Sequence, residues 1–489
     1  MLVRVAGTSI AMTGERTGYG LGPGPVIAGC IVFALVLFLP AVLNDGDTLW
    51  QIRTGEWILD HRAVPSTDPF SFTAGGRRWF AHEWLAETIM ALAFRTGGMV
   101  GIVVLAAGAT GLTAALLLRF LLRFLPGLYA VLFLVLALAN AASSLLARPH
   151  LLAWPCLVLW CGGLVTARAT RTLPSLWLLP VMVLWVNLHG SFMFGLLLPI
   201  GFLLEAALEA GEQRRRVILG WSGFIAAAWV AALINPEFWA GVMFPVTMLG
   251  MQSLAWIGEW QPTTFGSPQP LELMILAGLA LGLSGTLRLP PVRLLLLLVL
   301  VHAALAHARN QQLLGIVGML IIAESVGRML PGQAATASRS WPRLAIASAA
   351  IAAVALAARI IFPLDPERSG EAFAMLINRV PVALRDQPVL NGYSLGGQLI
   401  FNGVRPFVDS RADLYGDAFL DGYRKIASGD QAALDRALTD YAVQWTIFHA
   451  HDPVVGILDH MPGWRRLLEA DDIIIQVRAA EPAPGTKSQ

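Results

Sequence analysis

The sequence predicts a polytopic α-helical membrane protein of about eleven transmembrane helices, with a C-terminal soluble α/β domain on the non-cytoplasmic side. Hydrophobic residues make up 56% of the 489 residues and charged residues only 13%, which excludes a wholly soluble chain. Apolar runs such as Val26–Leu43 are long enough to cross a hydrocarbon core of roughly 30 Å. Because many such runs alternate with short polar breaks, we expect repeated crossings, and runs this long cross as helices.

The expected spans follow the apolar runs in order. A polar, glycine-rich segment, residues 1–24, precedes the first run. No small-residue cleavage site follows that run, so we expect an uncleaved signal anchor behind a cytoplasmic N-terminal segment. The remaining chain to residue 362 forms the membrane domain. Its expected spans are residues 25–43, 98–118, 127–146, 150–167, 174–187, 191–208, 217–234, 270–286, 294–307, 312–327 and 343–361.

The arginine distribution predicts the orientation, because basic residues gather in short cytoplasmic loops. With the N-terminus in the cytoplasm, the opposite short loops contain few cations beyond Arg148 and Arg309. We therefore expect a multi-pass protein of the bacterial inner membrane whose polar segments face outward. The arginines expected on the cytoplasmic side are Arg119, Arg123, Arg168, Arg171, Arg214, Arg215, Arg216, Arg288, Arg293, Arg328, Arg339 and Arg343.

Three segments are expected to leave the bilayer on the outer side: residues 44–97, 235–270 and 363–489. The first contains two amphipathic patterns, near Leu49–His61 and Ala81–Phe94, which predict helices. In the third, the composition changes to that of a soluble domain, and β-rich stretches alternate with helical patterns such as Ala432–Tyr441, which is typical of a small α/β fold. The expected strands are Val389–Asn391, Pro406–Asp409, Trp445–His449 and Ile473–Val477.

Composition also excludes several classes of function. The three cysteines, Cys30, Cys156 and Cys161, all lie inside apolar runs, so neither a disulfide framework nor a cysteine metal site is expected. A formal net charge of +2 gives no reason to expect a nucleic-acid partner. The sequence contains no P-loop and no His-Glu-x-x-His motif.

The sharpest polar motif is Asp45-Gly46-Asp47, directly after the first span. One carboxylate of such a pair suits a general base, and the other suits orientation of a hydroxyl or binding of a divalent cation such as magnesium or manganese. The alternative is a solvated turn in which Asp47 caps the helix beginning near Thr48. Glu83, later in the same loop, is a further candidate acid.

Basic residues recur at the outer ends of the later spans. Arg148 and Arg309 suit a phosphate or diphosphate, because a guanidinium binds pairs of oxygens and stays charged. Their alternative is to extend toward the interface along apolar surface. His150 lies beside Arg148, across a proline. His189, between two spans, suits hydrogen bonding to a substrate or a carboxylate, or a purely structural turn.

The remaining candidates for substrate binding lie in the first loop and the tail. Trp50 suits stacking on a sugar ring, with an interfacial aromatic belt as its alternative. Asp68 and His82 share its loop. In the tail, Asp409 and Arg411 follow an expected strand and suit ligand binding, with a structural salt bridge as their alternative.

These motifs together resemble the multi-spanning glycosyltransferase superfamily C, and within it a bacterial subgroup described mostly from sequence. The resemblance covers most of the chain. It rests on Asp45–Trp50, Gly55, Ile58-Leu59, Pro65, Asp68–Phe72, His82–Leu85, Arg148–His150, Asn187–Gly190, Glu259–Gln261 and a tail signature of Asn391–Tyr393, Gly396-Gly397 and Phe407–Tyr415.

The resemblance implies transfer of a sugar from a polyprenyl-phosphate carrier to a glycan, lipid or protein acceptor at the outer face of the membrane. The catalytic carboxylate of the superfamily maps to Asp47 or Asp45, with Glu83 or Asp68 in place of the second acid found in better-known branches. The alternative is a transporter, flippase or scaffold for lipid-linked glycans. A transporter favours charges near the midplane and inverted repeats, and the sequence shows neither.

Overall fold

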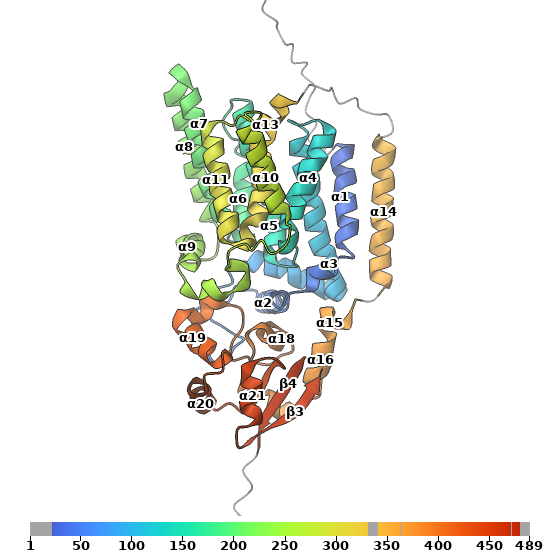
Figure 1. Ribbon diagram of the computed structural model, residues 1–489, viewed down its shortest axis with the longest axis vertical. Coiled ribbons are helices and arrows are strands. Elements are labelled where there is room, and N and C mark those ends of the chain that lie inside the picture. The colour runs from blue at the N-terminus through green and yellow to red at the C-terminus, as the bar shows by residue number, and fades with distance from the viewer. Residues whose placement is uncertain (1–21, 331–340, 363, 471, 480–489) are drawn as a thin grey trace, which may run out of the picture.

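The computed structural model describes residues 22–330, 341–362, 364–470 and 472–479. Most helices run side by side in one large body, helix α2 lies across one end of it, and the C-terminal domain packs beyond α2 (Figure 1). The expected cytoplasmic segment falls largely outside the described residues.

The helices of the large body follow the apolar runs of the sequence. A π-helix, Leu314–Gly318, joins two of them. The α-helices are α1 Pro23–Val36, α2 Asp47–His61, α3 Trp84–Leu121, α4 Gly127–Ala141, α5 Pro149–Ala169, α6 Leu178–Leu188, α7 Phe192–Glu209, α8 Arg214–Ala232, α9 Phe238–Leu249, α10 Pro270–Leu283, α11 Pro291–Ala306, α12 Gln311–Leu313, α13 Met319–Met329 and α14 Trp341–Ile361.

The prediction of a helical membrane protein is confirmed. Among the described residues, six helical stretches are long and apolar enough to cross a membrane: Trp84–Leu121, Gly127–Ser144, Pro149–Ala169, Phe192–Glu209, Ala308–Met329 and Trp341–Ile361. Five further apolar helices, α1, α6, α9, α10 and α11, are shorter.

Several expected boundaries were wrong. The first helix ends at Val36, and Pro40 then starts a short 3-10 turn, because proline has no amide hydrogen for an interior helical bond. Helix α3 combines the second amphipathic helix with the next span. It breaks at Gly98, where φ is +56°, a conformation that favours glycine. Helix α9 was not expected at all.

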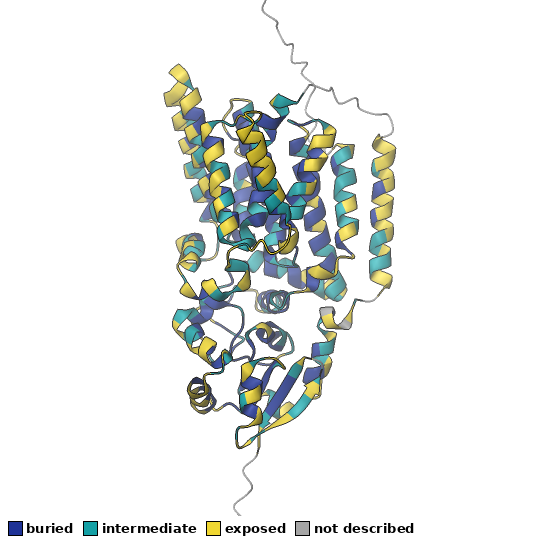
Figure 2. Ribbon diagram, viewed as in Figure 1, coloured by how far each residue is buried: buried dark blue, intermediate teal, exposed yellow. Residues whose placement is uncertain are grey.

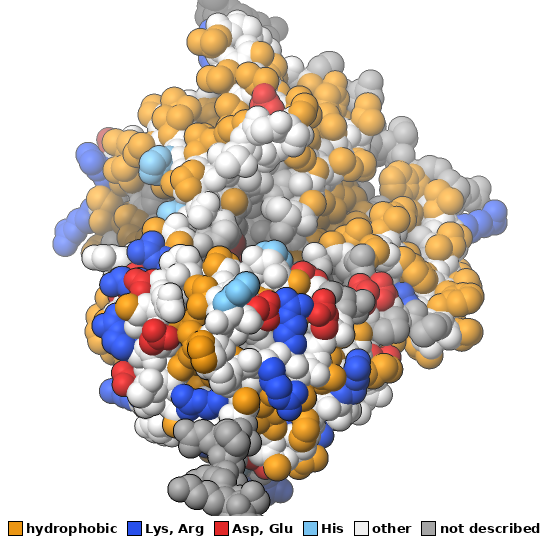
Figure 3. All heavy atoms as spheres, turned by 60° about the horizontal axis from the view of Figure 1, so that its bottom comes forward, with side chains coloured by type: hydrophobic (Ala, Val, Ile, Leu, Met, Phe, Trp, Pro, Cys, Tyr) orange, Lys and Arg blue, Asp and Glu red, His pale blue; other side chains and the backbone are white. Residues whose placement is uncertain are grey.

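The outer surface of the helical body is apolar. Helices α8, α10 and α14 expose much of their surface, whereas α3 and α5 contribute many buried residues (Figure 2). Hydrophobic side chains dominate the helical body in Figure 3, and the nearer face of the C-terminal domain mixes positive and negative side chains. An apolar belt of this kind suits contact with lipid.

A buried ionic network joins four of the helices. Arg293 of α11 binds Glu205 of α7 at 3.1 Å and Glu324 of α13 at 2.8 Å. Arg168 of α5 lies 3.6 Å from Glu205 and 2.7 Å from Glu209. Because an unpaired charge in an apolar interior is costly, these pairs keep α5, α7, α11 and α13 in register.

The tail forms a small α/β domain around a four-stranded sheet in the order β1-β2-β4-β3. Strand β1 pairs parallel to β2, and the other pairs are antiparallel. The strands are β1 Val389–Asn391, β2 Trp445–His449, β3 Trp464–Ala470 and β4 Ile473–Arg478, and the helices are α15 Pro366–Ser369, α16 Glu371–Asn378, α17 Val382–Arg385, α18 Gly396–Phe401, α19 Ala412–Ala427, α20 Gln431–Asp440 and α21 Pro453–Asp459.

The strand expected at Pro406–Asp409 was wrong, and β3 was not expected. Residues 406–409 are irregular rather than paired in the sheet. The buried Asn391 side chain holds them instead: it accepts a hydrogen bond from the Phe407 amide at 2.8 Å and donates one to the Val408 carbonyl at 2.8 Å. A side-chain amide thus satisfies the polar backbone that a strand partner would otherwise satisfy.

The ionic network predicts the cost of removing its central cation. Arg293→Met leaves Glu205 without its closest partner and takes from Glu324 its buried partner, so we expect a loss of about 3–5 kcal/mol in the free energy of unfolding. The double variant Arg293→Met/Glu205→Met should regain part of this loss. Thermal unfolding in detergent micelles measures both.

The matched control is Arg328→Gln, because Arg328 is 73% exposed and also pairs with Glu324. We expect a change of no more than about 1 kcal/mol there. Equal losses for Arg293→Met and Arg328→Gln would contradict the role given to the buried network.

Candidate functional site

The centre of the candidate site is the guanidinium of Arg148, which lies just before α5. Its Nε donates to one carboxylate oxygen of Asp45, and its Nη2 donates to the other at 2.7 Å. It also contacts the Asp47 carboxylate at 2.9 Å and that of Glu259 at 2.9 Å. The structure therefore brings the predicted acidic motif and the predicted arginine together. A guanidinium can do this because it presents five donors in one plane.

The backbone around this centre is held by hydrogen bonds between distant segments. The Thr48 hydroxyl donates to the Ala147 carbonyl at 3.0 Å, and the Ala147 amide donates to the Val42 carbonyl at 2.8 Å. Helix α2 begins at Asp47 itself, its N-cap residue is Gly46, and the Asp45 carboxylate accepts a hydrogen bond from the Asp47 amide at 3.2 Å. The alternative in which Asp47 caps this helix is therefore not observed.

A second arginine extends the cluster through Glu259. One oxygen of the Glu259 carboxylate meets Arg148, and the other lies 3.1 Å from Arg309. The guanidinium of Arg309 also lies over the ring of Trp260 at 4.3 Å, a favourable cation–π contact. The two arginines expected to bind phosphate therefore share one carboxylate.

The C-terminal domain completes the site through Ser410. Its hydroxyl donates to Asp47 and accepts a hydrogen bond from the Trp50 indole at 3.0 Å. Trp50 is itself buried, so its contact is with the tail rather than with an open surface. The expectation that Trp50 stacks on a sugar is therefore not supported by this arrangement.

Two glycines of the tail signature allow this close contact. A side chain at Gly397 would collide with the Gly46 carbonyl, between the two aspartates, and one at Gly396 would collide with the Val408 carbonyl. Helix α18 can therefore lie directly against the start of α2. The glycine pair is a packing requirement of the site.

The surroundings of Asp47 change its acidity. Loss of hydration raises the pKa of Asp47 to about 6, with Arg148 opposing the rise and Asp45 adding to it. A carboxyl group with a pKa near neutrality can accept a proton efficiently at physiological pH.

A second acid, Glu83, lies among histidines. Its carboxyl oxygen is 3.5 Å from Nε2 of His189 and 3.7 Å from Nε2 of His82. Burial raises the pKa of Glu83 to about 8, although Arg309 and Arg148 oppose it. Burial lowers the pKa of His82 to about 3 and that of His189 well below its ordinary value. This group is therefore neutral near pH 7.

The proton of neutral His189 can be placed on one nitrogen. The Ser191 amide donates to Nδ1 of His189 at 3.1 Å, so Nδ1 carries no proton. The proton is on Nε2, the nitrogen that faces Glu83. His150 lies next to His189, with ring centroids 6.0 Å apart, and its Nε2 lies 2.6 Å from the Ser144 carbonyl.

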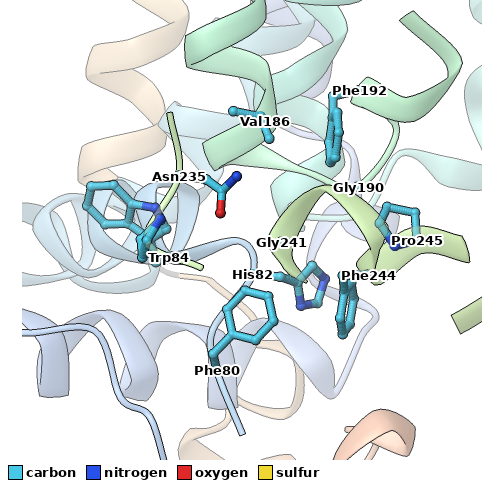
Figure 4. Close-up of a pocket in the computed structure, with 11 residues that line it drawn as sticks. Phe80, His82, Trp84, Val186, Gly190, Phe192, Asn235, Gly241, Phe244 and Pro245 are labelled. Carbon is cyan, nitrogen blue, oxygen red and sulfur yellow. The ribbon is translucent and has the colours of Figure 1, made fainter. Parts of the chain in front are cut away.

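A small hollow lies beside His82 (Figure 4). The imidazole of His82 stacks on the ring of Phe244 at 4.0 Å, and Asn235 and Trp84 line the opposite side. Its walls are mostly apolar and aromatic. Of the group around Glu83, His82 lines this hollow.

Three residues predicted to bind substrate form a buried ion cluster instead. Arg411 binds Asp409 at 2.7 Å and Asp68 at 2.7 Å, and the exposed fraction of each residue is at most 3%. Burial alone would raise the pKa of Asp68, but Arg411 and the hydrogen bond from Ser71 lower it. The cluster fastens the first loop to the tail, and the alternative of a structural salt bridge is the one observed for Asp409 and Arg411.

The arrangement does not suit a divalent cation as it stands. Both carboxylates proposed as ligands, Asp45 and Asp47, face the guanidinium of Arg148, whose charge would repel a metal ion. Within the described residues, no group of three or more His, Cys, Asp or Glu side chains is arranged to hold a metal. In this site Arg148 supplies the positive charge.

Glu259 and Ser410 were missed as site residues. Both lie inside motifs of the family resemblance, Glu259–Gln261 and the tail signature, and these motifs could have marked them as candidates. Their role depends on contacts between positions more than 100 residues apart, which no local pattern encodes.

Sequence reasoning also missed a Gly-x-Ser-x-Gly run, Gly392–Gly396. The Ser394 hydroxyl lies 3.2 Å from His449 Nε2, and Asp472 lies 2.9 Å from Nδ1 of the same ring. In hydrolases this motif holds the serine in a strained turn, whereas Ser394 is not among the residues with positive φ. The run therefore lacks the backbone geometry of a nucleophile turn.

The fold and the site together define a multi-pass helical membrane protein with an ionic site where its helices meet a small α/β domain. No protein-family model matches the chain, and a search of curated proteins finds no match either.

The buried cluster predicts a strong effect of removing Arg411. Arg411→Met leaves two buried carboxylates unpaired, so we expect a loss of about 3–5 kcal/mol in the free energy of unfolding. Limited proteolysis should also release the tail domain more readily. The exposed Arg466, which pairs with Asp459 and Glu469, provides the control Arg466→Gln, with little expected change. Equal protease resistance of Arg411→Met and wild type would refute the fastening role.

Glu83 predicts a pH dependence of stability. Between its ordinary value of 4.5 and about 8, the unfolded carboxyl ionises while the folded one stays protonated, so its contribution to stability falls as pH rises. Glu83→Gln should remove this component, and its midpoint of thermal unfolding should fall less than that of wild type between pH 5 and pH 8. Glu56→Gln, which removes the partner of Arg53, is the control. Parallel curves for wild type and Glu83→Gln would contradict the assignment.

Proposed function

We propose that this protein is an inverting glycosyltransferase that moves a sugar from a polyprenyl-phosphate carrier to a cell-envelope acceptor. The observation that supports it best is the site around Asp47, where a carboxyl group of raised pKa contacts Arg148, and Glu259 joins Arg148 to Arg309. This pairing of a base with phosphate-binding cations is what such a transfer needs. The resemblance to glycosyltransferase superfamily C supports the same proposal.

The proposal includes a topology. The eleven expected spans cross the bacterial inner membrane with the N-terminus in the cytoplasm, and the site and the tail domain lie on the outer side. Two features support it: the arginine distribution, and the position of α2 and the tail domain at one end of the helices (Figure 1). At that end a lipid carrier could lie along the apolar helices while its phosphate reaches the site.

The reaction is a single displacement at the anomeric carbon. The acceptor oxygen attacks from the face opposite the phosphate, and its bond to the anomeric carbon forms as the bond from carbon to phosphate oxygen breaks. Asp47 takes the proton of the acceptor hydroxyl. The bonding electrons leave with the polyprenyl phosphate, whose growing negative charge Arg148 and Arg309 stabilise.

Neighbouring residues prepare Asp47 for this role. The Ser410 hydroxyl holds one carboxylate oxygen, while Arg148 contacts the other. Asp45 binds Arg148 from a second side, so it fixes the guanidinium rather than the acceptor. Asp47 is therefore the base in this proposal, and Asp45 is a positioning residue.

The neutral group of Glu83, His82 and His189 suits the sugar. A protonated carboxyl and a neutral imidazole both donate hydrogen bonds without adding charge, which is what sugar hydroxyls require. Of the three, His82 lines the hollow. We assign this group to binding of the sugar.

The transporter alternative is less well supported. Arg148 precedes α5 and Arg168 lies near its other end, and a helix of this length separates its ends by about 30 Å. The Arg148 site and the Arg168 network therefore lie at opposite ends of α5. A transport pathway would instead favour charged groups near the midplane of the bilayer.

The proposal predicts the effect of removing the base. Asp47→Asn should lower transfer of radiolabelled sugar from a polyprenyl-phosphate donor to membrane acceptors by about 10²–10⁴-fold. In wild type, kcat/KM should rise with pH through about 6, the pKa of Asp47, because the ionised form is the base. Washed membranes that contain equal amounts of each variant provide the assay.

The control lies on the same helix. Asp60 near the end of α2 pairs with the half-exposed Arg95, so Asp60→Asn should leave transfer unchanged. Wild-type levels of product from Asp47→Asn would exclude Asp47 as the base.

A further inference from the structure

Glu259 occupies the place between Arg148 and Arg309 that a phosphate would fill. Each of its carboxylate oxygens meets a different guanidinium, at 2.9 Å and 3.1 Å. Guanidinium groups bind carboxylates and phosphates through the same charge-assisted N–H···O hydrogen bonds. The Glu259 carboxylate therefore offers the two arginines anionic oxygens like those of the phosphate that they are proposed to bind.

The charge of the cluster favours a phosphate that replaces Glu259 over a phosphate that binds in addition to it. Arg148 and Arg309 contribute two positive charges, and Asp45, Asp47 and Glu259 contribute three carboxylates. A phosphate monoester that joined this group would face three like charges, which disfavour its binding. If the phosphate replaces Glu259, the balance of charge stays close to that of the resting site.

Glu259 is the carboxylate that leaves most easily. Its side chain is 34% exposed, against 7% for Asp45 and 22% for Asp47, so it loses the least hydration in its present place and regains it most readily. Asp45 is held by two nitrogens of Arg148, and Asp47 is held by Ser410 as well. Among the described residues, the Glu259 side chain accepts hydrogen bonds from the two arginines alone.

The backbone around Glu259 allows its side chain to move without refolding. The Gln252 and Ser253 amides bind Asp417 of the tail, and on the other side the Gln261 carbonyl accepts from Ala308. Between these anchors, Gly258 faces open space. A rotation of the Glu259 side chain is then enough to free both arginines.

We propose that Glu259 is a displaceable stand-in for phosphate, which keeps the anion site closed until a phosphate-bearing ligand takes its place. This inference rests on the proposed function, because it assumes that Arg148 and Arg309 receive a phosphate. It adds the residue that controls access to the site. The apparent dissociation constant for the phosphate ligand equals its intrinsic value divided by the fraction of sites that Glu259 leaves free. Occupancy by Glu259 therefore weakens the apparent affinity.

The test measures binding of phosphate ligands to the full-length protein in detergent micelles. Labelled polyprenyl monophosphate and inorganic phosphate are titrated separately against wild type and Glu259→Gln. We expect Glu259→Gln to bind polyprenyl monophosphate roughly tenfold more tightly than wild type, because the competing charge is gone. A gain with both ligands means that the phosphate alone is recognised, and a gain with the lipid alone means that its tail is also needed; either supports the stand-in.

Two variants complete the design. Glu237→Gln removes another partly exposed carboxylate that pairs with an arginine, Arg78, and should leave the affinity unchanged. Arg309→Gln should abolish binding. Glu259→Asp, which is too short to reach both arginines, should also bind more tightly than wild type and guards against an effect peculiar to glutamine.

The outcomes separate the two proposals. If Glu259→Gln and Glu259→Asp bind no more tightly than wild type while Arg309→Gln loses binding, the stand-in is wrong and the phosphate site of the proposed function remains. If binding does not depend on Arg309, the stand-in is wrong and the proposed function loses its donor site. The transfer assay with Asp47→Asn is independent of both results.

Discussion

The site depends on one guanidinium. Arg148 holds together the segment after the first helix, the start of α2 and the turn that contains Glu259. Without a cation among them, three carboxylates would repel one another and their segments would separate. The same charge is what a departing phosphate requires, so in this protein the group that organises the resting site is also the group proposed to act in the reaction.

The tail domain is part of the site. Ser410 orients Asp47, Trp50 is covered by the tail, and the ion cluster of Arg411 fastens the first loop to it. The contact is close because Gly397 lies against the Gly46 carbonyl. In the proposed reaction, an acceptor that approaches Asp47 would therefore meet the tail domain as well as the membrane helices, which would give this domain a direct influence on acceptor choice.

The sequence predicted the helices and the members of the site better than their contacts. Apolar runs predicted helical spans because lipid leaves the backbone few alternatives, and the polar motifs identified Asp47 and Arg148 as candidates. The roles of Trp50, Asp68 and Arg411 could not be predicted, because a charge or an indole looks the same in sequence whether it is buried against another segment or free to meet a ligand. The strand expected at Pro406–Asp409 failed for a related reason: a distant amide, Asn391, replaces the sheet.

The long separation between Asp47 and Ser410, 363 positions along the chain, has a consequence for biosynthesis. Domains emerge and fold in the order in which they are translated, so Asp47, Trp50 and Asp68 are synthesised long before the tail that contacts them. The ionic centre can form early, but its last hydrogen bond and the Arg411 clasp wait for the final quarter of the chain. A prematurely terminated product would therefore insert its helices and still lack a finished site, and the proposed chemistry would be restricted to chains that ribosomes have completed.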